Sequence, residues 1–403
     1  MSKNVPFHFI NTMKQALSDI FDKQKHADRV IDKYVRANPN WKPEDRKLFY
    51  DSIYEVVRNK YRYEFAAESE DYLALSAAAQ LMKGNKCLPH AGLQPIDTQK
   101  FKQRWAEIKV DHLKYSIPEW LYSLLKNEVK ASDLNHFLDS LNETPITYLR
   151  VNTLKIESEK LIEKLKTDKI KAVVPKTAGF TTTNCLQVVE GKNIFASGAY
   201  KEGFFEMQDF GSQQIAPLLQ VEPGMNVVDA CCGSGGKSLQ LAAIMKNSGK
   251  LLSMDVVDNK LKDLKIRAVK AGAKIIDTKL ITNEKILQPL QNKFDRVLLD
   301  VPCSGSGVLK RNPEIKWNLN EENLSQLIQT QKQILLNYSK MVVKGGRVVY
   351  ATCSLLTEEN EKQIEAFLNT ESGKKFKLEK QIRIWPHLNK CDGFYAAVLI
   401  RES

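Results

Sequence analysis

The sequence predicts an α/β fold whose C-terminal half is a doubly wound parallel sheet. From about residue 206 onward, apolar runs typical of strands alternate with runs at helical spacing, and glycine-containing turns join them. Such alternation with short connections is typical of a parallel sheet covered by helices. The strand-like runs are residues 225–230, 250–256, 273–281, 295–301 and 346–353, and the helical runs include 237–246 and 259–272.

Two smaller domains are expected before the sheet. Residues 1–112 carry apolar residues at helical spacing and no strand-like alternation, which predicts a helical domain. Residues 113–205 mix helical stretches with extended pieces, which predicts a small α+β connecting domain. With the sheet in residues 206–403, the chain is long enough for three compact cores.

The charge balance suggests a polyanionic partner. The net charge is +12, which fits nucleic acid, although many moderately basic proteins bind none. Basic and aromatic residues interleave near the end of the helical region, at Arg58, Lys60, Tyr61, Arg62 and Tyr63. This mixture can meet RNA through phosphates and stacking. The alternative is a solvated basic face above core tyrosines.

Neither a membrane segment nor a metal site is expected. The longest apolar runs are far shorter than the roughly 18 residues that span a bilayer, and the N-terminus lacks a signal-peptide hydrophobic region. The seven cysteines include no Cys-x-x-Cys pair, which argues against a disulfide framework and against structural zinc. We expect a cytoplasmic monomer.

A glycine turn follows the first strand of the sheet. Gly233, Gly235 and Gly236 lead from that strand into a helix, where backbone can approach a ligand. The phosphate-binding P-loop pattern fails because Cys231 stands at its first glycine. The dinucleotide pattern fails because Ser238 stands at its third.

What remains is a turn for a ligand without a phosphate chain. Asp255, at the end of the next strand, can accept hydrogen bonds from ribose hydroxyls. An adenosine cofactor without phosphates, S-adenosylmethionine (SAM), therefore fits better than ATP or NAD. Glycine turns of this kind also occur for packing reasons alone.

Two cysteines follow later strands of the same sheet. Asp300 and Cys303 stand at the end of the fourth strand, and Cys353 at the end of the fifth. Ligands of doubly wound sheets bind beyond the carboxyl ends of the strands, so these three residues should converge near the cofactor. A single cysteine at a strand end is more often a buried hydrophobe. Two of them beside a carboxylate are harder to explain by packing.

These groups suit methylation of cytosine at carbon 5. That carbon is a poor nucleophile until a thiolate adds temporarily to carbon 6, and a nearby cation such as Lys237 would help the thiolate to form. A carboxyl such as Asp300 could bind or protonate N3. The second thiol has a place in the release step. The target base must be unstacked or single-stranded.

The same residues resemble the NOL/NOP/Sun family of RNA cytosine-C5 methyltransferases, which includes RsmB-like bacterial enzymes. The resemblance covers about residues 115–400. It is carried by "LRVNTLK", "MQDFGSQ", "DACCGSGGKS", "FDRVLLDVPCSGSGVLKRNP", "GGRVVYATCSLLTEENE" and "DGFYAAVL". It implies a Rossmann-like class I methyltransferase fold with SAM as cofactor and RNA as substrate.

The resemblance also implies residue roles. It makes Cys353 the carbon 6 nucleophile and Cys303 the residue that assists product release, with Asp300 and Lys237 lining the same pocket. It places cofactor contacts at Cys231, Cys232, Gly233, Ser234, Gly235, Gly236, Lys237, Asp255, Asn283 and Asp300. It places Arg150 and Asn152 near the RNA.

Some features depart from the family pattern or leave alternatives open. The family's turn reads A-C-A-A-P-G-G-K, whereas Cys232, Gly233 and Ser234 stand here at the A-A-P positions. Backbone contacts tolerate such changes. The N-terminal region loosely resembles the NusB-like RNA-binding domain. Ribosomal RNA is favoured over transfer RNA by the resemblance alone, and the alternatives are a non-catalytic RNA-binding assembly factor and a small-molecule methyltransferase.

Overall fold

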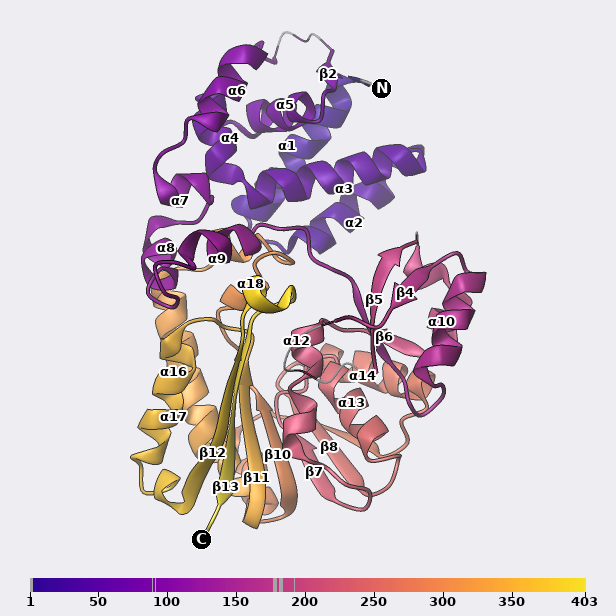
Figure 1. Cartoon of the computed structure of the whole chain (residues 1–403), viewed down its shortest axis with the longest axis vertical. Coiled ribbons are helices and arrows are strands. Elements are labelled where there is room, and N and C mark those ends of the chain that lie inside the picture. Colours follow the sequence, from indigo (N-terminus) through magenta and orange to yellow (C-terminus); the bar gives the residue numbers. More distant parts are fainter. Residues whose placement is uncertain (1–2, 89, 91, 177–179, 181–183, 192) are drawn as a thin grey trace. The chain divides into compact units, whose positions relative to one another are not determined.

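The computed structural model describes residues 3–88, 90, 92–176, 180, 184–191 and 193–403 (Figure 1). Contacts divide the chain into two compact units. The first comprises Met1–Thr144 with Val308–Glu321, and the second comprises Pro145–Gly307 with Glu322–Ser403. This division falls after Thr144, and the domain boundary predicted after residue 112 stays a prediction. The helices that follow residue 112 pack with the first unit.

The first unit is helical, as predicted. Its helices are α1 (Phe7–Phe21), α2 (Ala27–Ala37), α3 (Pro43–Arg58), α4 (Lys60–Ala67), α5 (Tyr72–Met82), α6 (Thr98–Ala106), α7 (Asp111–Lys114), α8 (Glu119–Leu125), α9 (Leu134–Ser140) and α15 (Ile315–Asn318). Their apolar faces enclose a core that includes Met13, Leu17 and Phe49. A short parallel pair of strands, β1 (Asn4–Val5) and β2 (Lys86–Cys87), was not predicted.

The interleaved basic and aromatic residues of α3 and α4 contact protein groups. Tyr63 is fully buried, and the Arg62 guanidinium lies 4.1 Å from the ring centre of Trp105. Lys60 pairs with Glu64 at 2.6 Å. Burial lowers the pKa of the Arg62 guanidinium. These contacts favour the structural alternative over the predicted meeting with RNA.

Residues of the segment Val308–Glu321 cap the C-terminal end of α3 in the first unit. The last carbonyls of a helix lack partners within that helix. At the end of α3, Trp317 Nε1 donates to the Val57 carbonyl at 2.7 Å, and Lys316 Nζ donates to the Arg58 carbonyl at 2.6 Å. Lys316 is buried, which lowers its pKa. The segment Val308–Glu321 is therefore part of this unit's core.

The second unit begins with a small antiparallel sheet. Its strands, in the order β4-β5-β3-β6, are β3 (Tyr148–Val151), β4 (Lys171–Val173), β5 (Cys185–Glu190) and β6 (Phe205–Met207). Helix α10 (Ser158–Thr167) packs on it through Leu161 and Leu165. The predicted mixture of helix and extended chain is confirmed.

A seven-stranded sheet forms the rest of the second unit, in the order β12-β13-β11-β10-β7-β8-β9. The strands are β7 (Asn226–Asp229), β8 (Lys250–Asp255), β9 (Ile276–Leu280), β10 (Phe294–Asp300), β11 (Val342–Thr352), β12 (Phe376–Ile384) and β13 (Phe394–Arg401). The five predicted strands pair in parallel. The last two strands were not predicted, and β13 runs antiparallel to both β12 and β11.

Helices cover both faces of this sheet. On one face, α13 (Gly236–Ile244) and α14 (Asp258–Ala271) pack against side chains such as Val227. On the other, α16 (Glu321–Tyr338) and α17 (Glu361–Leu368) pack against neighbours such as Val228 (Figure 1). Successive strand residues point to opposite faces, so an apolar run without alternation is what a sheet buried on both faces requires.

The strand order decides which loops meet. β10 lies between β11 and β7, and β8 lies on the other side of β7. Since these four strands are parallel, the loops after them share one edge of the sheet. Every residue predicted to be catalytic lies in or directly beside one of these loops. Within the described ranges, no helix is long and apolar enough to span a bilayer, and no group of His, Cys, Asp and Glu could hold a metal ion.

Candidate active site

The glycine turn connects β7 to α13 and has an open surface. Gly233 and Gly235 have φ of +54° and +86°, a region that favours glycine. A Cβ added at Gly235 would lie 2.0 Å from Leu264 Cδ1, whereas one at Gly233 or Gly236 would meet nothing within 4 Å. The turn is therefore packed against the protein at Gly235 and open at Gly233 and Gly236.

Asp255 at the end of β8 supports this turn. One of its carboxylate oxygens accepts from the Gly233 N–H at 2.9 Å, and the other accepts from the Val257 N–H at 2.9 Å. An ionised carboxylate has about four acceptor sites. Asp255 can therefore hold the turn and still accept from ribose hydroxyls, so an open glycine surface edged by a carboxylate fits the nucleoside part of SAM.

The other predicted cofactor residues have protein partners as well. The Cys232 N–H donates to the Met254 carbonyl at 2.9 Å, and the Ser234 carbonyl accepts from Arg267 at 2.6 Å. Burial raises the pKa of the Cys231 thiol well above its ordinary value. Asn283 follows β9 and is exposed, and its side chain accepts from the Lys285 N–H at 3.0 Å. Its contact with the cofactor stays a prediction.

Lys237 and Asp300 form an ion pair at the edge of the sheet. Lys237 is in the first turn of α13, and its Nζ lies 2.6 Å from Asp300 Oδ2 at the end of β10. The side chains are 10% and 28% exposed. The predicted convergence of these two residues is thus present in the structure.

The two predicted thiols also meet. Cys303 Sγ and Cys353 Sγ lie 3.3 Å apart because Asp300 of β10 pairs with Ala351 of β11, which places the loops that follow side by side. The hydrogen bond to Cys353 and burial raise the pKa of the Cys303 thiol well above its ordinary value. The two sulfurs are thus close enough to share one hydrogen bond.

Gly393, just before β13, packs against the loop that follows Cys303. The Gly307 N–H donates to the Cys353 carbonyl at 2.9 Å, and the Gly393 N–H donates to the Gly307 carbonyl at 2.7 Å. A Cβ at Gly307 would lie 2.3 Å from the Gly393 oxygen. The loops of both cysteines and the start of β13 therefore pack backbone against backbone.

The structure gives no support to the predicted RNA contact of Arg150 and Asn152. Both residues are 6% exposed. Arg150 donates to the Gly236 carbonyl at 2.6 Å and to Gln208, and Asn152 donates to the Gly203 and Ala271 carbonyls at 2.8 Å each. Arg150 thus bonds to the first residue of α13, and Asn152 joins the chain before β6 to the end of α14. Sequence reasoning missed this role because a surface charge and a buried one look alike in a linear pattern.

Sequence reasoning also missed Glu359. This residue is fully buried, and it accepts hydrogen bonds from serines of both cysteine loops. Its only signal in the sequence was its place shortly after Cys353, within an acidic run that usually indicates a solvated turn.

Comparison with known proteins agrees with this geometry. Residues 216–400 match the family described as "16S rRNA methyltransferase RsmB/F", and residues 117–181 match the "Methyltr_RsmF/B-like, ferredoxin-like domain". The chain is 31% identical to ribosomal RNA small subunit methyltransferase B of Shewanella oneidensis, over 72% of this chain and 68% of that protein. It is 28% identical to the protein of that name from Photorhabdus laumondii, over 82% and 78%.

A solved structure extends the match to the whole chain. The "Crystal Structure of PH0851" covers 100% of both chains with a TM-score of 0.77 and 25% identity. These similarities, together with the glycine turn, the thiol pair and the Lys237–Asp300 pair, lead to one conclusion: the chain belongs to the RsmB/F (Sun) family of methyltransferases, and SAM is its cofactor.

Proposed function

We propose that this protein methylates carbon 5 of a cytosine in ribosomal RNA of the small subunit. The observation that carries the proposal is the pair of thiols 3.3 Å apart, at the ends of neighbouring strands. The names of the relatives support ribosomal RNA as the substrate. The net charge of +12 suits a polyanion.

Cys353 is the nucleophile in this proposal. Burial and the contact with Cys353 raise the pKa of the Cys303 thiol well above its ordinary value, which disfavours Cys303 as the attacking thiolate. The Cys353 Sγ adds to carbon 6 of the cytosine, and the ring electrons that this addition displaces make carbon 5 nucleophilic.

Asp300 and Lys237 act on the ring during this addition. The Asp300 carboxyl binds N3 or delivers a proton to it, and so stabilises the electron density that moves toward this ring nitrogen as sulfur adds to carbon 6. Lys237, at 2.6 Å, stabilises the negative charge of Asp300. SAM, when bound, supplies the electrophilic methyl group.

Release restores the aromatic ring. Carbon 5 then carries a methyl group and a hydrogen, and this hydrogen must leave as a proton to a base while the bond between carbon 6 and sulfur breaks. The electron pair of that bond leaves with Cys353 as a thiolate. Cys303 assists this step from its position beside Cys353.

Bisulfite sequencing tests the proposal. A cytosine of small-subunit ribosomal RNA that is protected in the wild-type strain should become convertible when the gene is deleted, and wild-type protein should restore protection. Loss of a protected site in transfer RNA instead would change the substrate. No lost site, with the gene shown to be expressed beforehand, would refute cytosine-C5 methylation.

RNA binding by the helical unit and the cytoplasmic monomer both stay predictions. Mass photometry with and without RNA would check the oligomeric state.

A further inference from the structure

Glu359 is an unusual residue for its position. It ends the short helix η6 (Thr357–Glu359) after Cys353, and its side chain is 0% exposed. Burying a carboxylate is costly unless hydrogen bonds replace its water. Its contacts must therefore account for its presence in the core.

Four donors satisfy this carboxylate. Oε1 accepts from the Ser304 N–H at 2.7 Å and from Gln331 Nε2 at 2.8 Å. Oε2 accepts from the hydroxyls of Ser304 and Ser354. Hydrogen bonds to an ionised acceptor are about twice as strong as neutral ones. The set is complete, because two oxygens of a carboxylate offer about four acceptor sites.

The two serines are the chain neighbours of the two thiols. Ser304 follows Cys303, and Ser354 follows Cys353. Glu359 therefore joins the two cysteine loops through one rigid group. Ser306 adds a second link, because its hydroxyl lies 3.0 Å from that of Ser354 and accepts from the Leu355 N–H at 2.8 Å.

We propose that Glu359 is a positioning residue, which ties the loop of Cys303 to the loop of Cys353 and so holds the two thiols at reacting distance. Its link to catalysis rests on the roles proposed above for the cysteines. The geometric part, the distance between the thiols, does not depend on them.

The charge of Glu359 acts in the same direction. The largest contributions to the raised pKa of the Cys303 thiol come from the hydrogen bond with Cys353, burial and the charge of Cys353. The Glu359 carboxylate adds a smaller contribution in the same direction. It thereby helps Cys303 to keep its proton.

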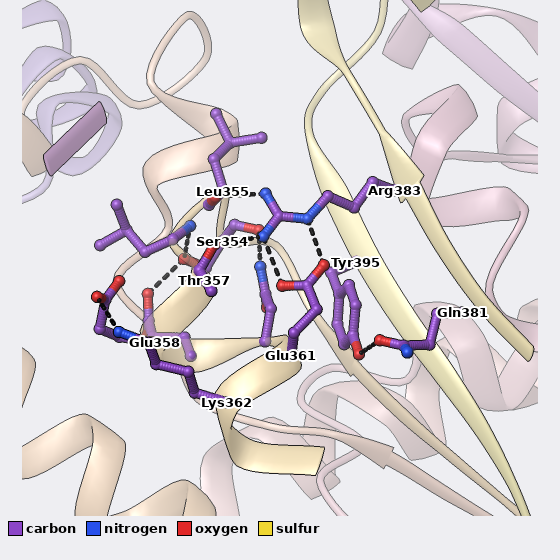
Figure 2. Close-up of polar contacts among 12 residues, drawn as sticks. Ser354, Leu355, Thr357, Glu358, Glu361, Lys362, Gln381, Arg383 and Tyr395 are labelled. Atoms are coloured by element: carbon purple, nitrogen blue, oxygen red, sulfur yellow. Dashed lines mark hydrogen bonds and ion pairs between the residues drawn. The ribbon is translucent and has the colours of Figure 1, made fainter. Parts of the chain in front are cut away.

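Arg383 of β12 holds one of the same loops from another direction and offers a matched control. Figure 2 shows its guanidinium directed at Glu361, Leu355 and Thr357. It pairs with both carboxylate oxygens of Glu361 and donates to the Leu355 carbonyl at 3.0 Å and to Thr357 Oγ1 at 2.8 Å. These contacts anchor the loop that follows Cys353 without touching Ser304.

Thiol cross-linking tests the proposal directly. Diamide joins two neighbouring thiols: each thiol gives up a proton and an electron, a disulfide forms, and the N=N bond is reduced to a hydrazine. In Glu359→Gln the negative charge is lost and one acceptor oxygen becomes a donor nitrogen, so every charge-assisted bond is weakened and the donors that face the nitrogen must turn or lose their partner. Loss of the Glu359 charge by itself would make the Cys303 thiolate easier to form and speed the reaction, so slower cross-linking reports a change in the distance between the thiols. The Cys303–Cys353 disulfide, followed by peptide mass spectrometry, should form about ten-fold more slowly, the factor for about one charge-assisted hydrogen bond.

The control variants separate an effect on the distance between the two thiols from a general loss of protein stability. Arg383→Met should lower the melting temperature but leave the rate of cross-linking within about two-fold. Ser304→Ala should slow cross-linking, and adding it to Glu359→Gln should slow it little further, because both changes break one network. All rates are measured where circular dichroism shows folded protein. Equal rates in wild type and Glu359→Gln, or equal losses in Glu359→Gln and Arg383→Met, would overturn the proposal.

Methylation kinetics distinguish this inference from the proposed function. With ribosomal RNA as substrate, Glu359→Gln should lower kcat and leave KM for RNA unchanged, since no RNA contact is altered. If the wild-type protein methylates no cytosine, the proposed function fails, yet the cross-linking result still decides whether Glu359 sets the thiol distance. If kcat is unchanged while cross-linking slows, its link to catalysis is refuted.

Discussion

Cys353 and Cys303 share one hydrogen bond but have opposite tasks in the proposed reaction. Replacing Cys353 by Ala should abolish methylation and any covalent complex with RNA, because Cys353 is the group proposed to add to carbon 6. Replacing Cys303 by Ala should instead leave protein trapped on RNA, seen as a shifted band on a denaturing gel.

Cys87 supplies the control for these two variants. It is a half-buried thiol of the first unit, and burial raises its pKa to about 11. Cys87→Ala should methylate at the wild-type rate and leave no trapped complex. Identical behaviour of Cys353→Ala and Cys303→Ala would show that the two roles are assigned wrongly.

Asp229 at the end of β7 should make stability depend on pH. Burial raises its pKa to about 7, although Ser238 donates to it at 2.6 Å. Between about pH 4 and the folded-state pKa, the folded chain holds a proton that the unfolded chain has released. The contribution of Asp229 to stability therefore falls as pH rises through this window.

Replacing Asp229 by Asn should flatten this dependence. The full loss in wild type is of the order of 4 kcal/mol for three pKa units, an upper value for a buried group, and about 2 to 3 kcal/mol of it falls between pH 5 and pH 7.5. Urea unfolding at pH 5 and pH 7.5 measures the difference. If the variant loses as much stability as the wild type over this interval, Asp229 does not cause it.

At the residue scale, only part of the site was readable from the sequence. Cys303, Cys353, Asp300 and Lys237 stood in motifs at strand ends, and the structure brings each thiol and each charge to its partner. The bond of Arg150 to a buried carbonyl and the role of Glu359 were not predicted, because the sequence shows their charges but not the buried oxygens and hydroxyls that satisfy them.

At the scale of elements, the glycine turn depends on two constraints that can be separated. Gly235 has a φ of +86° and no room for a Cβ beside Leu264, whereas Gly345, in β11, has a φ of +76° and open space. Gly345→Ala should cost about 1 kcal/mol through backbone strain alone. Gly235→Ala should cost about 3 kcal/mol, because Leu264 must also move.

Thermal unfolding and calorimetric titration with S-adenosylhomocysteine check this pair of variants. Gly235→Ala should also weaken the binding of that ligand, and Gly345→Ala should not. Equal losses of stability in the two variants would mean that the contact between the added Cβ at residue 235 and Leu264 does not destabilise the protein.

The elements of the sheet were predicted unevenly, for a physical reason. Each of the five parallel strands is an apolar run followed by a turn and, in two predicted cases, a helix, so the local pattern suffices. β12 and β13 pair with each other and with β11 by antiparallel register. Such pairing depends on neighbours distant in the chain, and β12 is mostly exposed or half-buried, so its local pattern is weak.

At the scale of the whole molecule, the chain leaves the sheet after Gly307 and returns at Glu322, and the residues between belong to the helical unit. Trp317→Ala should therefore destabilise that unit by about 2 to 3 kcal/mol, since it removes a half-buried ring 4.8 Å from the ring of Tyr61 and the donor to the Val57 carbonyl.

Hydrogen exchange measures where this loss falls. Amides at the end of α3 should exchange faster in Trp317→Ala, while the central strands β7 and β10 keep their protection. An equal loss of protection in both units, or none in α3, would contradict the assignment of this segment to the helical unit.

The sequence by itself determined the order of strands and helices, the glycine turn, the two thiols and the resemblance to a methyltransferase family, because each of these is written in local pattern or in a short motif. Tertiary structure decided which buried charges are structural, where the chain divides into units, and how Glu359 joins the two cysteine loops. These depend on hydrogen bonds between residues far apart in the chain, and only folding determines which donor meets which acceptor.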